Sequence, residues 1–448
     1  MKNLLECVGG CPLDIVSYRS AVDVMLLLLP YTKQIRSLDF NFNTWPEIRT
    51  FSELNSGPLP LLRMLRINEI EGIDLDNPDA MIPSIPFFST AVNMQEFQLH
   101  SWNWLPLNHF VFPNLTFFEL SAIRGELQAA QLLGFLEASL MLQTVHMDMY
   151  GVISFDGVPR ERVAVLHNVK SFCLVMGDGE PCCKLATHIS CPSVKHTSLT
   201  RQHEDLDSST PQEIFPASVS WNTIIRQYTS SPLEEVALEM EASPNLTITC
   251  SLTFRSPDAS VIQLHSAFAT DGVEDEDEDE FEMSLTEMYC EVFSQASRTI
   301  RDFALPTNIK RLRICHTSPV FYRTQTTRTT EEIGQLLKSV GPLEELLLHQ
   351  CDMEAYLASF HDFGKPVEFP PIKELTISHP FRSFGMDFEE AMMGLVKSQH
   401  ALGIPFERVT IRMDRLPAEM AEKLRPWVGA VHCYNEVEPT YVPMYTPM

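Results

Sequence analysis

The chain has 448 residues, of which 44% are apolar and 21% charged, a composition that excludes disorder throughout and suits two or three compact domains or one elongated one. Its 59 acidic residues outnumber its 33 basic residues and give a formal net charge of −26. We therefore expect no nucleic-acid partner and no membrane partner, because phosphate backbones and anionic lipids both attract positive surfaces.

The first part of the chain contains one short apolar run, residues 24–29, which lies between Asp23 and Pro30. It has neither the basic segment nor the cleavage site of a signal peptide, and no run reaches the roughly 18 apolar residues of a membrane-spanning helix. The eleven cysteines are scattered and never form a CxxC pair, which favours reduced thiols. The sequence predicts a cytoplasmic or nuclear protein.

A six-residue pattern, LxxLxL, recurs along the chain at irregular intervals of 21 to 76 residues. Its copies start at Ile35, Leu62, Met94, Leu115, Leu142, Val169, Val194, Leu233, Ile309, Leu343, Ile372 and Phe406. Several copies follow an apolar helical segment and a tight turn, and others follow a proline, which suits the start of a strand. Each unit has one apolar face that it can bury only by stacking on its neighbours.

This recurrence predicts an α/β fold, an irregular leucine-rich-repeat solenoid over residues 1–435. In such a solenoid a curved parallel sheet forms the concave side, and helices and loops form the convex side. A doubly wound α/β domain, which also alternates strand and helix, is the alternative.

The longest interval, from Leu233 to Ile309, contains two strand-like stretches, 247–254 and 261–265, and a helical stretch, 285–303. We predict that these conceal one or two degenerate repeats. Between them, residues 274–280 are all acidic, which predicts an acidic disordered insertion over residues 268–284. This insertion is either a solvated loop or an attractive site for a basic partner. Residues 436–448 are predicted to form a C-terminal tail.

Motifs of catalysis are absent from the sequence, which contains no GxSxG elbow, HExxH helix, P-loop or GxGxxG turn. Residues 74–79 imitate the opening of a calcium loop, but Asp79 and Ile85 occupy the positions that require Gly and Glu. The sequence therefore predicts no enzyme activity, no cofactor and no metal.

The candidate site is the predicted concave surface, to which the third, fifth and seventh residues of each LxxLxL strand should point. Its partner-binding candidates are Arg66, Glu96, His100, Glu119, His146, Asp148, Glu235, Glu239, Arg311, Arg313, Glu345, His349, Arg408 and Arg412. On the strands up to and including the one that starts at Leu233, the predicted surface has six acidic residues and one arginine. On the later strands it has four arginines and two glutamates. This predicts a polarised groove for a protein partner with an acidic or phosphorylated end near the arginines. Solvated variable positions are the alternative, and we treat the histidines as ordinary exposed residues.

Five stretches carry a resemblance to a known family. They are CPLDIV (Cys11–Val16), LLLLPYTKQIRSLDF (Leu26–Phe40), TWPEIRTFSELNSGPLPLLRMLRI (Thr44–Ile67), FLEASLMLQTVHM (Phe135–Met147) and EKLRPWVGAVHCY (Glu422–Tyr434). With them the chain resembles the leucine-rich-repeat region of F-box proteins abundant in mushroom-forming (basidiomycete) fungi. The resemblance implies a receptor of a Skp1–cullin–F-box ubiquitin ligase, whose repeats bind the protein substrate that is to be ubiquitinated.

The sequence departs from that family in one respect, since no F-box is recognisable ahead of the repeats. Docking to Skp1 and a cullin is therefore an expectation that rests on the resemblance alone. The alternative is a stand-alone repeat scaffold or inhibitor with no link to a ubiquitin ligase. A third interpretation is a regulator resembling the Ran GTPase-activating proteins, which also combine leucine-rich repeats with an acidic tract.

Overall fold

A computed structural model of the chain describes residues 10–17, 21–42, 59–70, 91–101, 107, 110, 112–123, 126–176, 184–203, 233–242, 248–268, 290–301, 309–316, 327–351, 361–362, 365–366, 371–383, 386–414 and 419–434. The chain divides into two compact units. Unit 1 comprises Met1–Gln202 and Val219–Ser230, and unit 2 comprises His203–Ser218 and Ser231–Met448. The predicted tail, 436–448, lies outside the described residues, as does the predicted acidic insertion apart from Phe268.

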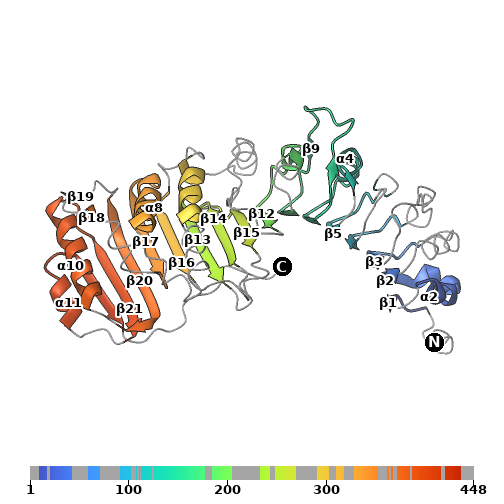
Figure 1. Ribbon diagram of the computed structural model, residues 1–448. Coiled ribbons are helices and arrows are strands. Elements are labelled where there is room, and N and C mark those ends of the chain that lie inside the picture. Colours follow the sequence, from blue (N-terminus) through green and yellow to red (C-terminus); the bar gives the residue numbers. More distant parts are fainter. Residues whose placement is uncertain are drawn as a thin grey trace, which may run out of the picture. The chain divides into compact units, whose positions relative to one another are not determined.

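The sheet of unit 1 contains eight described strands, all of which pair in parallel with their neighbours (Figure 1). In sheet order they are β1 (Leu13–Ser17), β2 (Ile35–Phe42), β3 (Met64–Ile70), β4 (Glu96–His100), β5 (Phe117–Ile123), β7 (Thr144–Met149), β10 (Ser171–Met176) and β12 (His196–His203). Two short ladders join β6 (Leu127–Gln128) to β8 (Ile153–Ser154) and β9 (Ala164–Val165) to β11 (Ile189–Ser190). The described helices are α2 (Ala21–Leu28), the 3-10 helix η1 (Leu29–Gln34), α4 (Ala129–Ala138) and a single helical turn at residues 184–187.

The same tight turn precedes each strand of unit 1 from β3 to β12, apart from the short strands of the two ladders. In each turn a backbone N–H donates to the carbonyl three residues earlier, and the side chains of both residues are buried. The donor and acceptor residues are Leu62 and Leu59, Met94 and Ala91, Leu115 and Phe112, Leu142 and Ser139, Val169 and Leu166, and Val194 and Cys191. The repeating unit therefore begins three residues before the LxxLxL pattern.

Five phenylalanines form the centre of the core of unit 1. Phe97 and Phe118 point from β4 and β5 toward α4, where the ring of Phe135 lies 4.6 Å from that of Phe118 and 6.2 Å from that of Phe97. Phe110 and Phe112, from the segment before β5, each lie 5.1 Å from Phe97. All five are at most 3% exposed. These contacts place α4 on the apolar face of the sheet and leave the opposite face to polar side chains.

Unit 2 contributes eight more described strands, ordered β15-β14-β13-β16-β17-β20-β21-β22. Their bounds are β13 (Glu235–Ala242), β14 (Ile248–Arg255), β15 (Val261–Phe268), β16 (Arg311–His316), β17 (Leu343–His349), β20 (Ile372–Ser383), β21 (Arg408–Asp414) and β22 (Ala430–Tyr434). The strands β13, β16, β17, β20, β21 and β22 pair in parallel in this order. Strands β18 (His361–Asp362) and β19 (Lys365–Pro366) form a small separate ladder.

The degenerate repeats predicted at 247–254 and 261–265 are wrong in topology. Both stretches are strands, but β14 is antiparallel to β13 and β15 is antiparallel to β14. A turn over residues 256–260 joins β14 to β15, with Ala259 at a φ of +66°. So short a link cannot make a parallel connection, which needs about a dozen residues or more. The predicted helix is confirmed for residues 290–301.

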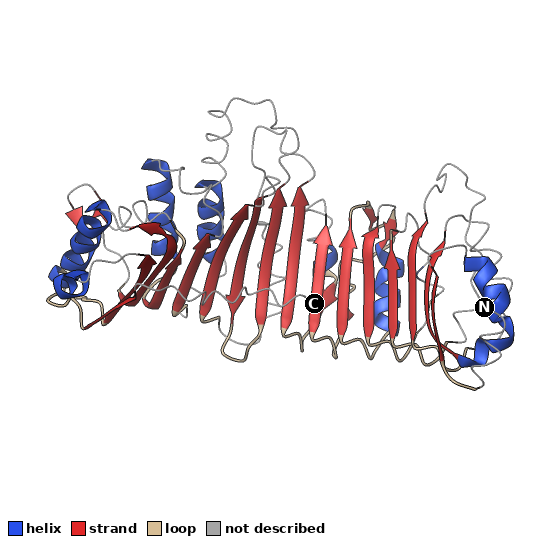
Figure 2. Cartoon of the chain, turned by 90° about the horizontal axis from the view of Figure 1, so that it is seen from below, coloured by secondary structure: helices blue, strands red, loops and turns tan. Residues whose placement is uncertain are grey.

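Helices α8 (Thr327–Ser339), α10 (Met386–Ala401) and α11 (Glu419–Leu424) supply buried apolar side chains to the core of unit 2. In Figure 2 the strands are seen face-on, and the described helices lie behind them or beside the outermost strands. No helix among the described ranges is long and apolar enough to cross a bilayer. The structure thus confirms an α/β chain with a large, mostly parallel sheet.

Candidate functional site: the polar sheet faces

The candidate site consists of the polar sheet face of each unit, on which the third, fifth and seventh residues of the LxxLxL strands lie. Strand β7 illustrates the alternation, with Val145, Met147 and Met149 buried and Thr144, His146 and Asp148 partly exposed. In-register pairing arranges these positions in rows that cross the strands. The middle row of unit 1, for example, reads Asp39, Arg66, Gln98, Glu119, His146, Cys173 and Ser198 from β2 to β12.

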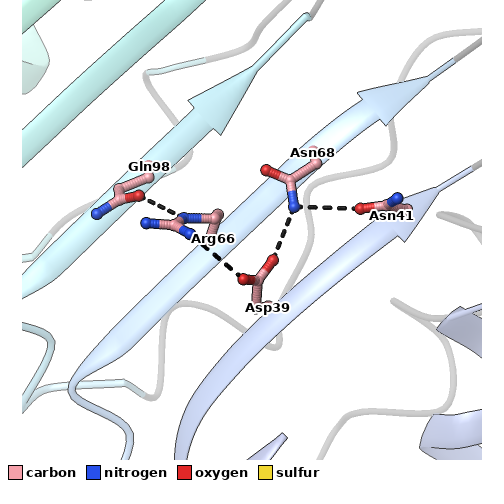
Figure 3. Close-up of polar contacts among 5 residues, drawn as sticks. All are labelled: Asp39, Asn41, Arg66, Asn68 and Gln98. Carbon is pink, nitrogen blue, oxygen red and sulfur yellow. Dashed lines mark hydrogen bonds and ion pairs between the residues drawn. The ribbon is translucent and has the colours of Figure 1, made fainter. Parts of the chain in front are cut away.

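A hydrogen-bonded network connects β2, β3 and β4 at the start of this row (Figure 3). Arg66 donates from Nε to Gln98 Oε1 at 2.5 Å, and its Nη1 lies 3.4 Å from Asp39 Oδ2. Asn68 donates from Nδ2 to Asp39 Oδ1 at 2.7 Å and to Asn41 Oδ1 at 3.1 Å. The side chain of Asp39 is only 10% exposed, and Arg66 and Asn68 supply hydrogen bonds to both of its carboxylate oxygens.

The next part of the polar face of unit 1 combines acidic residues with histidines. His146 Nδ1 on β7 lies 3.8 Å from Glu119 Oε1 on the neighbouring strand β5. Burial lowers the pKa of the His100 imidazole, although the Glu119 carboxylate acts in the opposite sense. Burial raises the pKa of Asp148, which His146 and a hydrogen bond from the Ala122 backbone partly counteract.

Cys173 and Ser198 end the middle row of unit 1 on β10 and β12. The Cys173 side chain is buried, and burial raises the pKa of its thiol to about 11 despite a hydrogen bond with Ser198. At neutral pH this thiol is protonated, so it is a poor nucleophile. The row therefore contains no activated cysteine.

The polar face of unit 2 has a buried carboxylate at its centre. Glu235 on β13 is 6% exposed, and its oxygens lie 3.2 Å from Arg313 Nε and 3.6 Å from Arg311 Nε on β16. Glu239, on the same strand, is also buried. These glutamates were predicted to line an open surface, but the neighbouring strands enclose them, and Arg311 and Arg313 both contact an internal partner.

The remaining candidates of unit 2 are spread over β17, β20 and β21. Arg408 donates from Nη1 to Glu374 Oε2 at 3.2 Å, and Glu345 lies between Arg311 and Glu374 in the same row. The Arg412 guanidinium lies over the Tyr434 ring, 5.5 Å from its centroid. Two strands separate the arginines of β16 from those of β21, a distance of about 14 Å at ~4.8 Å per strand.

The remaining candidates have the following environments. Glu96, on β4, is exposed, and burial lowers the pKa of His349 on β17. Among the described residues no group of three or more His, Cys, Asp or Glu side chains could hold a metal ion. Asn41, Asn68 and Gln98 were not among the predicted candidates, although they occupy positions five and seven of their copies of the pattern.

Chemically, these faces offer carboxylates paired with guanidinium groups, together with amides, and cross-strand contacts hold these groups in position. Such an array suits recognition of another molecule by hydrogen bonds and charge. No protein-family model matches the sequence, and no curated protein matches it significantly.

Proposed function

We propose that the chain is a non-enzymatic protein-recognition module, an irregular leucine-rich-repeat solenoid whose polar sheet faces bind a protein partner. By its resemblance to basidiomycete F-box proteins, this module is the substrate-binding part of a ubiquitin-ligase receptor and works in the cytoplasm or nucleus. The observation that supports the proposal is the in-register arrangement of polar side chains in rows across consecutive parallel strands.

Rows of this kind favour recognition because the cross-strand partners fix each side chain before a ligand arrives. The Arg66 guanidinium, for instance, is oriented by Asp39 and Gln98, and its side chain is still 38% exposed. A partner that binds such pre-oriented groups loses less side-chain entropy than one that must order them. The aromatic and aliphatic core behind the sheet supplies the rigidity.

The proposal is tested by affinity purification of the chain from its own cells with the proteasome inhibited, followed by mass spectrometry. A polar-face variant, Arg66→Glu with Glu119→Lys, should lose the partner. A control variant, Glu161→Lys with Glu390→Lys, changes exposed acidic residues off the polar faces and should retain it.

Co-purification of Skp1 and a cullin with the wild type supports the receptor, and proteins lost with the polar-face variant are its candidate substrates. A stoichiometric partner without Skp1 or cullin supports the stand-alone scaffold and removes the ligase link for this form of the chain. Equal recovery of every partner by both variants contradicts recognition through the polar face of unit 1.

A further inference from the structure

Away from the polar faces, we propose that the turns ahead of the strands of unit 1 form a second binding surface, which takes an acidic amphipathic helix of a protein partner. We call this surface the turn rim. It consists of residues 32–36, 59–63, 91–95, 112–116, 139–143, 166–170 and 191–195, which lead into β2, β3, β4, β5, β7, β10 and β12. The inference does not depend on the proposed function of the polar faces.

The charge of the turn rim is opposite to that of the whole chain. Although the chain carries a net charge of −26, the seven segments of the rim contain no Asp or Glu. Lys33, Arg63, Lys170 and Lys195 are exposed, and the described part of the chain supplies none of them with an ion-pair partner. Among the described residues, Arg36 alone of the rim cations has an acidic partner, Asp14 of β1. The rim therefore attracts negative charge.

The equivalent positions of unit 2 provide an internal comparison. There, the residue after the first position of the pattern alternates in sign along the sheet, as Glu234, Lys310, Glu344, Lys373 and Glu407. Lys310 Nζ lies 2.8 Å from Glu234 Oε1 on the neighbouring strand. Opposite charges thus alternate along these positions of unit 2, whereas the equivalent positions of the turn rim in unit 1 contain cations and no acidic residue.

The turn rim also exposes apolar side chains between its cations. The exposed fractions are 41% for Leu61, 55% for Val92, 69% for Leu140 and 47% for Met141. The prolines at the second turn position, Pro60, Pro113 and Pro192, are exposed as well. With Val92 and Leu140 they make the second position apolar in five of the six turns ahead of β3 to β12, a strip that His167 interrupts, and such a strip is typical of an interaction surface.

Asparagine side chains hold neighbouring turns of the rim together. Asn93 donates from Nδ2 to the Pro60 carbonyl at 2.7 Å, Asn114 to the Val92 carbonyl at 2.9 Å, and Asn168 to the Leu140 carbonyl at 2.9 Å. Each asparagine thereby satisfies a backbone acceptor of the preceding turn. The strip is therefore pre-organised, and a ligand needs to supply only apolar contacts and negative charges.

The spacing of the turn rim matches an α-helix. Adjacent strands lie ~4.8 Å apart, which is close to the 5.4 Å pitch of a helix. Seven turns therefore extend over about 29 Å, the length of a helix of about 19 residues. A nucleic acid is a poorer fit, because apolar side chains separate the few cations and most of its affinity would come from phosphates.

The test uses the full chain and a fluorescein-labelled synthetic peptide of 19 residues, with leucines on one helical face and glutamates beside them. Fluorescence anisotropy measures its Kd. Lys170→Glu with Lys195→Glu should weaken binding about tenfold or more, and Leu140→Ser with Met141→Ser should do the same. The matched control, Lys310→Glu with Lys373→Glu, changes the same residue type at the same repeat position of unit 2 and should leave Kd within about twofold.

The wild-type Kd should also rise with salt concentration, since the contact is electrostatic. Circular dichroism and thermal melting confirm the fold of each variant, and Arg63→Glu serves as a second rim variant should the lysine pair misfold. The proposal is overturned if the wild type does not bind the acidic peptide, or if the rim and control variants lose equal affinity. Tighter binding of a labelled oligonucleotide, lost in the same rim variants, would assign the rim to nucleic acid instead.

Discussion

Replacement of Phe135 by alanine should strongly destabilise unit 1. The Phe135 side chain is 1% exposed and connects α4 to the sheet through ring contacts with Phe118 and Phe97. Removal of a buried phenylalanine side chain costs about 3–5 kcal/mol, because its transfer energy is lost and a cavity remains. Of this, the aromatic pair geometry accounts for about 0.5–1.5 kcal/mol. The loss is a large part of the 5–15 kcal/mol that stabilises an ordinary domain.

Urea titration followed by circular dichroism measures the loss of stability, and hydrogen exchange with mass spectrometry locates it. The amides of β4, β5 and β7 should lose protection, whereas those of β17, β20 and β21 in unit 2 should keep theirs. Leu140→Ala is the matched control, since Leu140 is 69% exposed just beyond α4 and its loss should change stability by less than ~0.5 kcal/mol. A Phe135→Ala variant within ~1 kcal/mol of the wild type would refute the packing of α4 on the sheet.

Three further predictions concern backbone packing and protonation. Gly429→Ala should lower the free energy of unfolding by about 1–3 kcal/mol, because the new Cβ would lie 2.7 Å from the Glu407 backbone oxygen. Gly10→Ala is the control, since a Cβ at Gly10 meets open space. Equal melting temperatures for the two variants would contradict the prediction. The pKa of Asp14, lowered to about 2 by its hydrogen bond from Arg36, should return toward 3.8 in Arg36→Gln by NMR titration. The stabilisation from Asp14 should be present above pH ~4 and lost as the pH falls toward 2, and an unchanged Asp14 pKa in the variant would exclude the pair. Because burial lowers the pKa of His100 in the folded state, the unfolded state binds more protons, and stability should fall as the pH decreases below 6.5. His100→Gln should flatten the pH dependence of melting in that range, and an identical profile would show that His100 makes no contribution.

Much of the fold followed from one periodic pattern, because apolar residues at the first, fourth and sixth positions specify both the strand and the face that it buries. Strands β3, β5 and β7 lie where LRMLRI, LTFFEL and LQTVHM predicted them. The direction of β14 and β15 did not follow, since alternation is the same in parallel and antiparallel strands. Only the length of the connecting turn distinguishes the two arrangements.

The candidate site was predicted as a surface but not as a set of contacts. The pairs Asp39–Arg66 and Glu119–His146 occupy the same position in consecutive repeats, so the sequence contained the information to pair them once sheet order was known. The burial of Glu235 was not predictable in this way. It depends on two arginines of β16. The copy of the pattern that leads into β16 starts 76 residues after the copy that leads into β13.

The uniform turn of unit 1 has a consequence for how such a chain can change in length. Each repeat from β3 to β12 begins with the same hydrogen-bonded turn and pairs in parallel with its neighbour, so the points at which different repeats begin are equivalent. A segment that runs from one turn to the next can be duplicated or deleted with the backbone partners on either side preserved. The reversed strands β14 and β15 do not share this freedom, because removal of one alone would reverse the direction of pairing. We therefore expect recombination to add or remove parallel repeats one at a time, and to add or remove β14 and β15 only together.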